Sequence, residues 1–325
     1  MANLRTTADL VDAVLKRCGE LSDGTSAYDT GGDVLGYINS VYRGILAGAN
    51  EFGVDCGEPW VWAQASTPQI LELKPAYETG TVTLTNGSAS ATFSSAPSYS
   101  VAGWYFRAQG DTEWYTVSAH TAASTSLTLD QTYLGSSGSY NFKVVKLDYA
   151  LSTAVCRLVA PINIYKNTHS NMGLAEQGNI FELDPNTFAR KWPRVLLSEG
   201  IPESYAVVAR GTTDLITLRF SHYVSESTRA EVPYIPVADD LTDSGSSIPL
   251  IPFGSREVLL HGASYYIMLD KSDNRADAEA MLCKAKLQAL VHNNRKQLSL
   301  AGNTYGKLIP RRGPGRRRFG SNIDE

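Results

Sequence analysis

The sequence predicts an α+β fold in which N- and C-terminal helix pairs form an antiparallel helical bundle. Three observations predict it. Apolar residues recur at helical spacing near both ends of the chain, a Ser/Thr-rich stretch with alternating apolar residues occupies 75–149, and a proline-punctuated, strand-rich stretch fills 150–254. The bundle would therefore carry an inserted small β-sandwich or barrel, additional β segments and an extended C-terminal arm.

The N-terminal helix pair belongs to residues 1–74, half of the predicted bundle. Thr6 or Thr7 caps the first helix and Gly19 ends it. Asp33 caps the second helix, after a loop rich in Gly, Ser, Asp and Thr. The apolar residues of the two helices each share one face: Leu10, Val11, Val14, Leu15 and Cys18 in the first, and Leu35, Ile38, Tyr42, Ile45, Leu46 and Ala49 in the second.

The β module is predicted for 75–149. Residues 79–148 hold only seven charged side chains but 23 Ser or Thr, which is typical of short strands joined by turns. Val82 and Leu84 alternate with threonines, and Asn86-Gly87 is a strong two-residue hairpin signal. Gly110 marks a second turn, so five or six short strands are expected.

The C-terminal half divides into three predicted segments. Residues 150–254 are strand-rich and end in the stretch "VPYIPVADDLTDSGSSIPLIPFG", whose four prolines indicate an extended connection. Residues 255–300 form the second helix pair, the other half of the bundle, with Ser255 as the cap of its first helix and a start near Ser272 for its second. That last helix is expected to bury one apolar face: Ala278, Met281, Leu282, Ala285 and Ala289.

The remaining segment, 301–325, is an arginine-rich arm containing "PRRGPGRRRFG". Residues 307–325 carry a net charge of +4, whereas residues 1–306 carry −8. Glycine and proline oppose a helix there, so the arm is expected to be extended and to become ordered on contact; a disordered solubilising end is the alternative. Its candidate partner-binding residues are five arginines, which bind carboxylates or phosphates bidentately, and an adjacent phenylalanine: Arg311, Arg312, Arg316, Arg317, Arg318 and Phe319.

Motifs for chemistry are sparse. The five histidines are isolated, no metal-ligand spacing occurs, and Gly302–Leu308 departs from a phosphate loop in spacing and context. Cys18, Cys56, Cys156 and Cys283 are far apart and are expected to be buried, reduced thiols. The sequence therefore predicts no catalytic residue, no metal and no cofactor. The first residues show no signal peptide and no apolar run is long enough to span a bilayer, so synthesis in the cytoplasm and no membrane partner are expected.

Aromatic residues form a second candidate contact surface. Trp104, Trp114 and Tyr115 flank the Gly110 turn and would stack sugars or bases if they were exposed. Because adjacent strand residues face opposite ways, packing in the module core is the competing interpretation.

The order of these segments resembles the head-to-tail adaptor (connector) proteins of tailed bacteriophages. Three stretches carry the resemblance: "LVDAVLKRCGE … DVLGYINSVYRGILAGANEF" leading to "WVWAQA", the insertion "YETGTVTLTNGSASATFSS … SLTLDQTYLG", and "EVLLHGASYYIMLDKSDNRADAEAMLCKAKLQALVHNN". The resemblance implies a homo-oligomeric ring, commonly dodecameric, that lies in the virion neck, docks on the portal protein and presents a platform to other neck or tail proteins.

Three functional hypotheses follow. The first is a structural virion protein without catalysis, whose arginine-rich arm meets the portal first and the DNA in the channel second. The second is a tail component that binds carbohydrate or a receptor through the aromatic-bearing insertion. The third is an enzyme such as a cell-wall hydrolase, which requires a cleft with converging carboxylates.

Overall fold

The computed structural model describes residues 4–19, 33–48, 50–166, 178–211, 215–242 and 247–306. Its contacts divide the chain into two compact units. A helical unit combines Met1–Ala63 with Asp240–Glu325, and a β unit comprises Gln64–Asp239.

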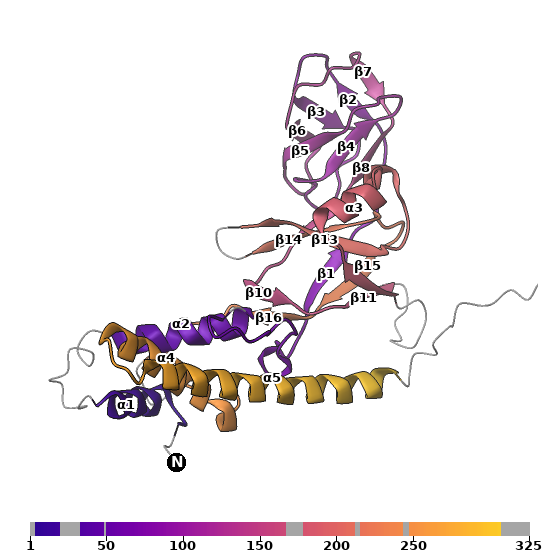
Figure 1. The fold of residues 1–325 in the computed structure, drawn as a ribbon. Helices are drawn as coiled ribbons and strands as arrows, with labels where there is room; N and C mark the ends of the chain where they lie inside the picture. Colours follow the sequence, from indigo (N-terminus) through magenta and orange to yellow (C-terminus); the bar gives the residue numbers. More distant parts are fainter. Residues whose placement is uncertain are drawn as a thin grey trace, which may run out of the picture. The chain divides into compact units, whose positions relative to one another are not determined.

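The predicted fold class is wrong, because the protein is mostly β. The described residues contain sixteen strands, fourteen of them in two seven-stranded sheets, and only five α-helices (Figure 1). The sequence suggested that the additional β segments were attached to a helical bundle. Those strands instead form a second sheet with its own hydrophobic core. The helices therefore form a unit of their own rather than a bundle on which the whole fold is built.

The helical unit contains helices from both ends of the chain. Its helices in the described residues are α1 Thr7–Cys18, α2 Asp33–Ala47, η1 Val61–Ala63, η3 Phe253–Ser255, α4 Glu257–Asp270 and α5 Ala276–Gly306. The start of α1 is as predicted: Thr6 accepts from the Asp9 amide while the Asp9 carboxylate accepts from the Thr6 amide, a complete capping box. Gly19 then ends α1 in the left-handed conformation, at φ 74°.

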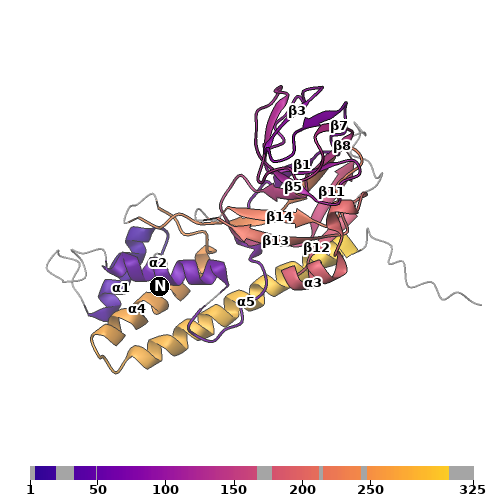
Figure 2. The ribbon, with the colours of Figure 1, turned by 90° about the horizontal axis from the view of Figure 1, so that it is seen from above.

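Helix α4 is the centre of this unit, since α1, α2 and α5 all pack on it (Figure 2). Its start differs from the prediction, because the cap position is Arg256 and no side chain caps the helix. Helix α5 also starts later than predicted, at Ala276, since Ser272 has φ 54° and cannot continue a right-handed helix. Leu259, Ala263 and Ile267 of α4 are fully buried.

Helices α2 and α4 approach each other closely at Gly262. A Cβ atom at this position would lie 2.8 and 2.9 Å from the two Cγ atoms of Val41. We expect Gly262→Ala to lower the free energy of unfolding by about 1–2 kcal/mol, because overpacking against a β-branched side chain outweighs the gain in helix propensity.

The Gly262→Ala effect is measurable by hydrogen exchange of α2 and α4 peptides. Val41→Ala in the same chain should remove the clash, so a double-mutant cycle should show coupling of about 1 kcal/mol. A stabilised Gly262→Ala variant would contradict the close approach.

The first seven-stranded sheet is almost a closed barrel, in the order β7-β2-β3-β6-β5-β4-β8. The hairpin predicted at Asn86-Gly87 is confirmed, since β2 pairs antiparallel with β3, and Gly87 has φ 79°. Its connection is longer than the predicted two residues, because β2 ends at Leu84 and β3 starts at Ser90. Strands β7 and β8 are separated only by Asn141, and they pair with β2 and β4 at the two edges, so one bent stretch of chain closes the sheet. The strand bounds are β2 Val82–Leu84, β3 Ser90–Phe93, β4 Tyr105–Ala108, β5 Tyr115–His120, β6 Ser126–Leu129, β7 Gly138–Tyr140 and β8 Phe142–Val145.

The second sheet has the order β1-β15-β11-β12-β13-β14-β9, with one parallel pair, β12 with β13. Side chains tie its two edge strands together. Gln69 of β1 accepts from the Ser152 amide (2.9 Å) and donates to the Thr153 carbonyl (3.3 Å), just after β9. Its strands are β1 Gln69–Leu73, β9 Asp148–Ala150, β11 Ile162–Lys166, β12 Gly178–Glu182, β13 Ser204–Arg210, β14 Ile216–Phe220 and β15 Thr228–Val232.

The β unit also contains a small sheet, two short helices and an ionic junction. The small sheet pairs β10 (Val155–Leu158) with β16 (Tyr234–Pro236), and the helices are α3 Pro185–Lys191 and η2 Val195–Leu197.

At the ionic junction, Arg219 of β14 donates two hydrogen bonds of 2.7 Å to the Asp148 carboxylate of β9. It also donates to the hydroxyl of Tyr105 in the first sheet at 2.6 Å. The two sheets are therefore bonded to each other by side chains.

Candidate docking surface of the helical unit

Helix α5 presents an apolar face to solvent. The face predicted to be buried is exposed along its whole length: Ala278, Met281, Leu282, Ala285 and Ala289. Met281 is 73% exposed and Leu282 39% exposed. The buried face lies on the other side of the helix and contains Ala276, Glu279, Cys283, Leu287, Leu290 and Asn294. We call the exposed set the outward face of α5.

The prediction chose the wrong face because the buried one contains polar residues with distant partners. Glu279 lies between α1 and α4 and is 5% exposed. Both of its carboxylate oxygens accept from the Arg17 Nε–H at 2.9 Å, and Oε2 lies 2.8 Å from Nδ1 of His261. Burial raises the pKa of the Glu279 carboxyl, but hydrogen bonds from Arg17 and His261 outweigh it and hold the pKa below its ordinary value.

A second polar anchor on the buried face is Asn294. Its amide nitrogen donates to the Pro59 carbonyl at 3.0 Å and its oxygen accepts from the Val61 amide at 2.9 Å. Next to them, the indole of Trp60 donates to the Ile45 carbonyl at the end of α2. The segment that follows α2 is therefore fastened to α5, and α5 is held in place along the region where its outward face lies.

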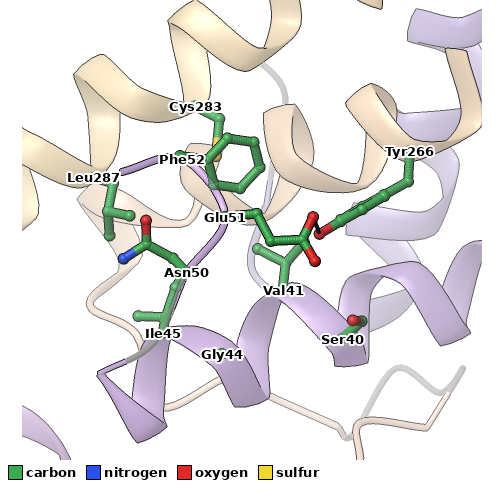
Figure 3. A pocket seen from close by; sticks show the side chains of 10 residues that line it. All are labelled: Ser40, Val41, Gly44, Ile45, Asn50, Glu51, Phe52, Tyr266, Cys283 and Leu287. Atoms are coloured by element: carbon green, nitrogen blue, oxygen red, sulfur yellow. Dashed lines mark hydrogen bonds between the residues drawn. The ribbon is translucent and has the colours of Figure 1, made fainter. Parts of the chain in front are cut away.

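Two hollows lie beside Phe52, against α5. The larger, about 350 Å³, is lined by α2, by the Asn50–Phe52 turn, and by α4 and α5 (Figure 3). The smaller, about 230 Å³, continues along α5 through Ala280, Met281 and Lys284. Glu51 and Phe52 line both. We call the two together the Phe52 groove; it is continuous with the outward face of α5 at Met281.

The chemistry of the Phe52 groove favours docking over catalysis. The Tyr266 hydroxyl donates to Glu51 at 2.8 Å, and burial together with that carboxylate raises the pKa of Tyr266 (Figure 3). Burial also raises the pKa of the Cys283 thiol to about 12, so the thiol is protonated at physiological pH and is a poor nucleophile. The walls are mostly apolar, with Ser40, Asn50 and Lys284 as further polar lining residues beside the bonded Glu51 and Tyr266. Such walls suit an apolar side chain from a partner.

A second exposed apolar surface of the helical unit is the extended stretch 247–253, which we call the proline segment. Ile248, Leu250 and Phe253 are exposed, whereas Ile251 between them is fully buried. Arg256, itself buried, donates to the carbonyls of Pro249 and Ile251 at 3.1 and 3.0 Å. These contacts and the two prolines fix the segment with its three large apolar side chains outward.

The site residues predicted from sequence have different outcomes. Arg311, Arg312, Arg316, Arg317, Arg318 and Phe319 lie outside the described residues. Trp104 and Tyr115 are 2% and 1% exposed and belong to the core of the first sheet, so they are not a contact surface. Trp114 is half-buried, with the guanidinium of Arg107 over its ring at 4.7 Å.

The described residues contain no group of three or more His, Cys, Asp or Glu side chains able to hold a metal ion. Within the same residues, no helix is long and apolar enough to cross a bilayer. The four cysteines form no disulfide among the described residues. Cys18, Cys56 and Cys283 are buried as predicted, whereas Cys156 is only half-buried.

Sequence reasoning missed the docking surface, although two signals were available. Apolar residues of α5 occur on two faces rather than one, which is a pattern of helices covered on both sides. The stretch "SIPLIPF" also places large apolar residues between prolines in a connection that cannot be a central strand. Comparison with known proteins adds nothing to these observations, because no protein-family model and no curated protein matches the chain.

Proposed function

We propose that the protein is a structural component of a tailed-phage virion: a head-to-tail adaptor that assembles as a ring in the neck, joins the portal to the tail and performs no catalysis. The observation that carries the proposal is the apolar surface of the helical unit, formed by the outward face of α5 and the Phe52 groove. An exposed apolar surface on a helical unit whose helices are fixed by buried polar contacts is typical of proteins that function in an assembly.

The arginine-rich segment supports the portal as the partner. It follows α5 directly in the sequence, since α5 ends at Gly306 and the first arginine of the segment is Arg311. Guanidinium groups pair bidentately with carboxylates, which makes an acidic portal surface the first partner, and DNA phosphates in the channel a second, salt-dependent one.

The decisive experiment is co-expression of the chain with the portal protein of the same phage, followed by native mass spectrometry and electron microscopy. We expect rings bound to portal, and loss of portal binding when the chain is truncated after Lys307. A full-length variant with all five arginines of 311–318 replaced by lysine keeps the charge and loses the bidentate geometry, so it should bind more weakly than wild type. Failure of the full chain to bind portal would overturn the proposal.

A further inference from the structure

The two exposed apolar surfaces of the helical unit lie on different sides of α2. Val41 and Ile45 of α2 line the Phe52 groove. Asn39 and Tyr42 instead face the chain that leads into the proline segment: Asn39 accepts from the Leu241 amide at 2.8 Å, and the Tyr42 hydroxyl accepts from the Leu250 amide at 3.2 Å. At 3.6 residues per turn these two faces are separated by roughly 110° around the helix.

The surfaces also have complementary forms. The proline segment projects large side chains from a fixed backbone, with Phe253 55% exposed. The Phe52 groove offers two hollows next to the exposed Met281. Because the two surfaces lie on different faces of the same small unit, the proline segment does not fill the groove of its own chain. The proline segment of a second copy is free to fill it.

We infer that the helical unit carries both halves of one head-to-tail contact between copies of this chain: the proline segment of one copy docks in the Phe52 groove and against the outward face of α5 of the next. A contact between two different surfaces repeats from copy to copy and closes into a ring when its rotation permits, whereas a contact of one surface with itself stops at a pair. The inference deepens the proposed function and rests on it for the ring.

Charge and rigidity favour the same occupant. Lys284 on the rim of the groove is exposed and forms no ion pair with the described residues, whereas Asp240, a few residues before the proline segment, is 58% exposed in its weak pair with Arg43. The docked arrangement brings these opposite charges to the same interface. Because both surfaces are already fixed by buried contacts of Arg256 and Asn294, little conformational entropy is lost on docking.

Disulfide cross-linking of the full chain tests this inference. In a Cys156→Ser background, the remaining natural cysteines are buried. The double variant Phe253→Cys/Met281→Cys should form a ladder of covalent multimers under mild oxidation, because each chain offers one thiol to each neighbour. As a matched control, Phe253→Cys/Leu134→Cys places the second thiol at a residue of the β unit that is 70% exposed, comparable to Met281, and should form no ladder.

Two outcomes would overturn the inference. One is a Met281→Cys single variant that gives covalent dimers as readily as the double variant gives multimers, because the surface would then pair with itself. The other is the absence of a 253–281 linkage at the highest protein concentration, with the peptides identified by mass spectrometry. As a second readout, Phe253→Asp and Met281→Asp should each weaken self-association by about tenfold or more while leaving the circular dichroism unchanged. A ladder without portal binding would refute the adaptor function alone; portal binding without a ladder would refute this contact alone.

Discussion

Glu279→Gln is expected to lower the free energy of unfolding of the helical unit by about 3 kcal/mol at pH 7. Glu279 joins α5 to α1 through Arg17 and to α4 through His261, and its side chain is 7% exposed. Removing the charge of one partner in a buried ionic cluster leaves the others poorly compensated, which costs about 3–5 kcal/mol. The low end applies here because Arg17 is 36% exposed and water partly solvates it in the variant.

The pH dependence of this effect has a defined sign. The pKa of Glu279 is lower in the folded protein than its ordinary value of 4.5, so its contribution to stability is complete above that value and is lost as the pH falls through the folded pKa. The difference between wild type and Glu279→Gln should therefore be constant near neutrality and shrink below about pH 4.5.

Hydrogen exchange of α4 and α5 peptides measures this difference separately from the β unit. Glu58→Gln is the matched control, because Glu58 pairs with Arg295 at 3.3 Å with both side chains about half exposed. Its effect should stay below about 1 kcal/mol. Equal effects of the two substitutions would show that the buried cluster does not stabilise the unit.

Arg219→Met is expected to lower the free energy of unfolding of the β unit by about 2 kcal/mol. Arg219 makes a bidentate contact with Asp148 and a third contact with Tyr105, and the three groups close a triangle because the Tyr105 hydroxyl also donates to Asp148 at 2.7 Å. Hydrogen bonds in which at least one partner is charged each contribute about 1.5–3 kcal/mol. The side chains of Arg219 and Asp148 are 33% and 21% exposed, so solvent lowers the total effect.

Arg219→Lys distinguishes geometry from charge at this junction. Lysine keeps the positive charge but cannot bind both carboxylate oxygens in a plane, so it should restore less than half of the lost stability. Tyr105→Phe should cost about 1 kcal/mol, since burial, together with Asp148, raises the pKa of Tyr105 to about 12 and marks its hydroxyl as a protonated donor. Urea unfolding followed by near-ultraviolet circular dichroism measures the stability of the Arg219→Met, Arg219→Lys and Tyr105→Phe variants. Lys74→Met is the control, because it breaks the more exposed ion pair of Lys74 with Glu72 (3.6 Å).

Local structure was predictable where short-range chemistry determines it. The capping box at Thr6 and Asp9, the stop at Gly19 and the hairpin at Asn86-Gly87 depend on residues within a few positions of one another. Sequence patterns of this length are enough to specify them.

The fold class and the choice of the buried face of α5 were not predictable, because they depend on distant polar partners. Glu279 and Asn294 occupy the buried face of α5 only because Arg17 and the Pro59–Val61 backbone, more than 230 residues away, bond to them. Gln69 likewise joins the edges of the second sheet through residues more than 80 positions later. Hydrophobic periodicity assigns such polar positions to solvent, so it placed α5 with the wrong side inward and left the second sheet as unconnected segments.

The division of the helical unit between the two ends of the chain has a consequence for biosynthesis. Helices α1 and α2 leave the ribosome well before α4, on which both pack, because α4 starts only at Glu257. The whole β unit, Gln64–Asp239, is synthesised in between and has its own cores, so it is able to fold while the nascent helices still lack their partner. Until α4 emerges, the apolar faces of α1 and α2 are open to chaperones and to other nascent chains on the same polysome, and the helical unit becomes competent for assembly last.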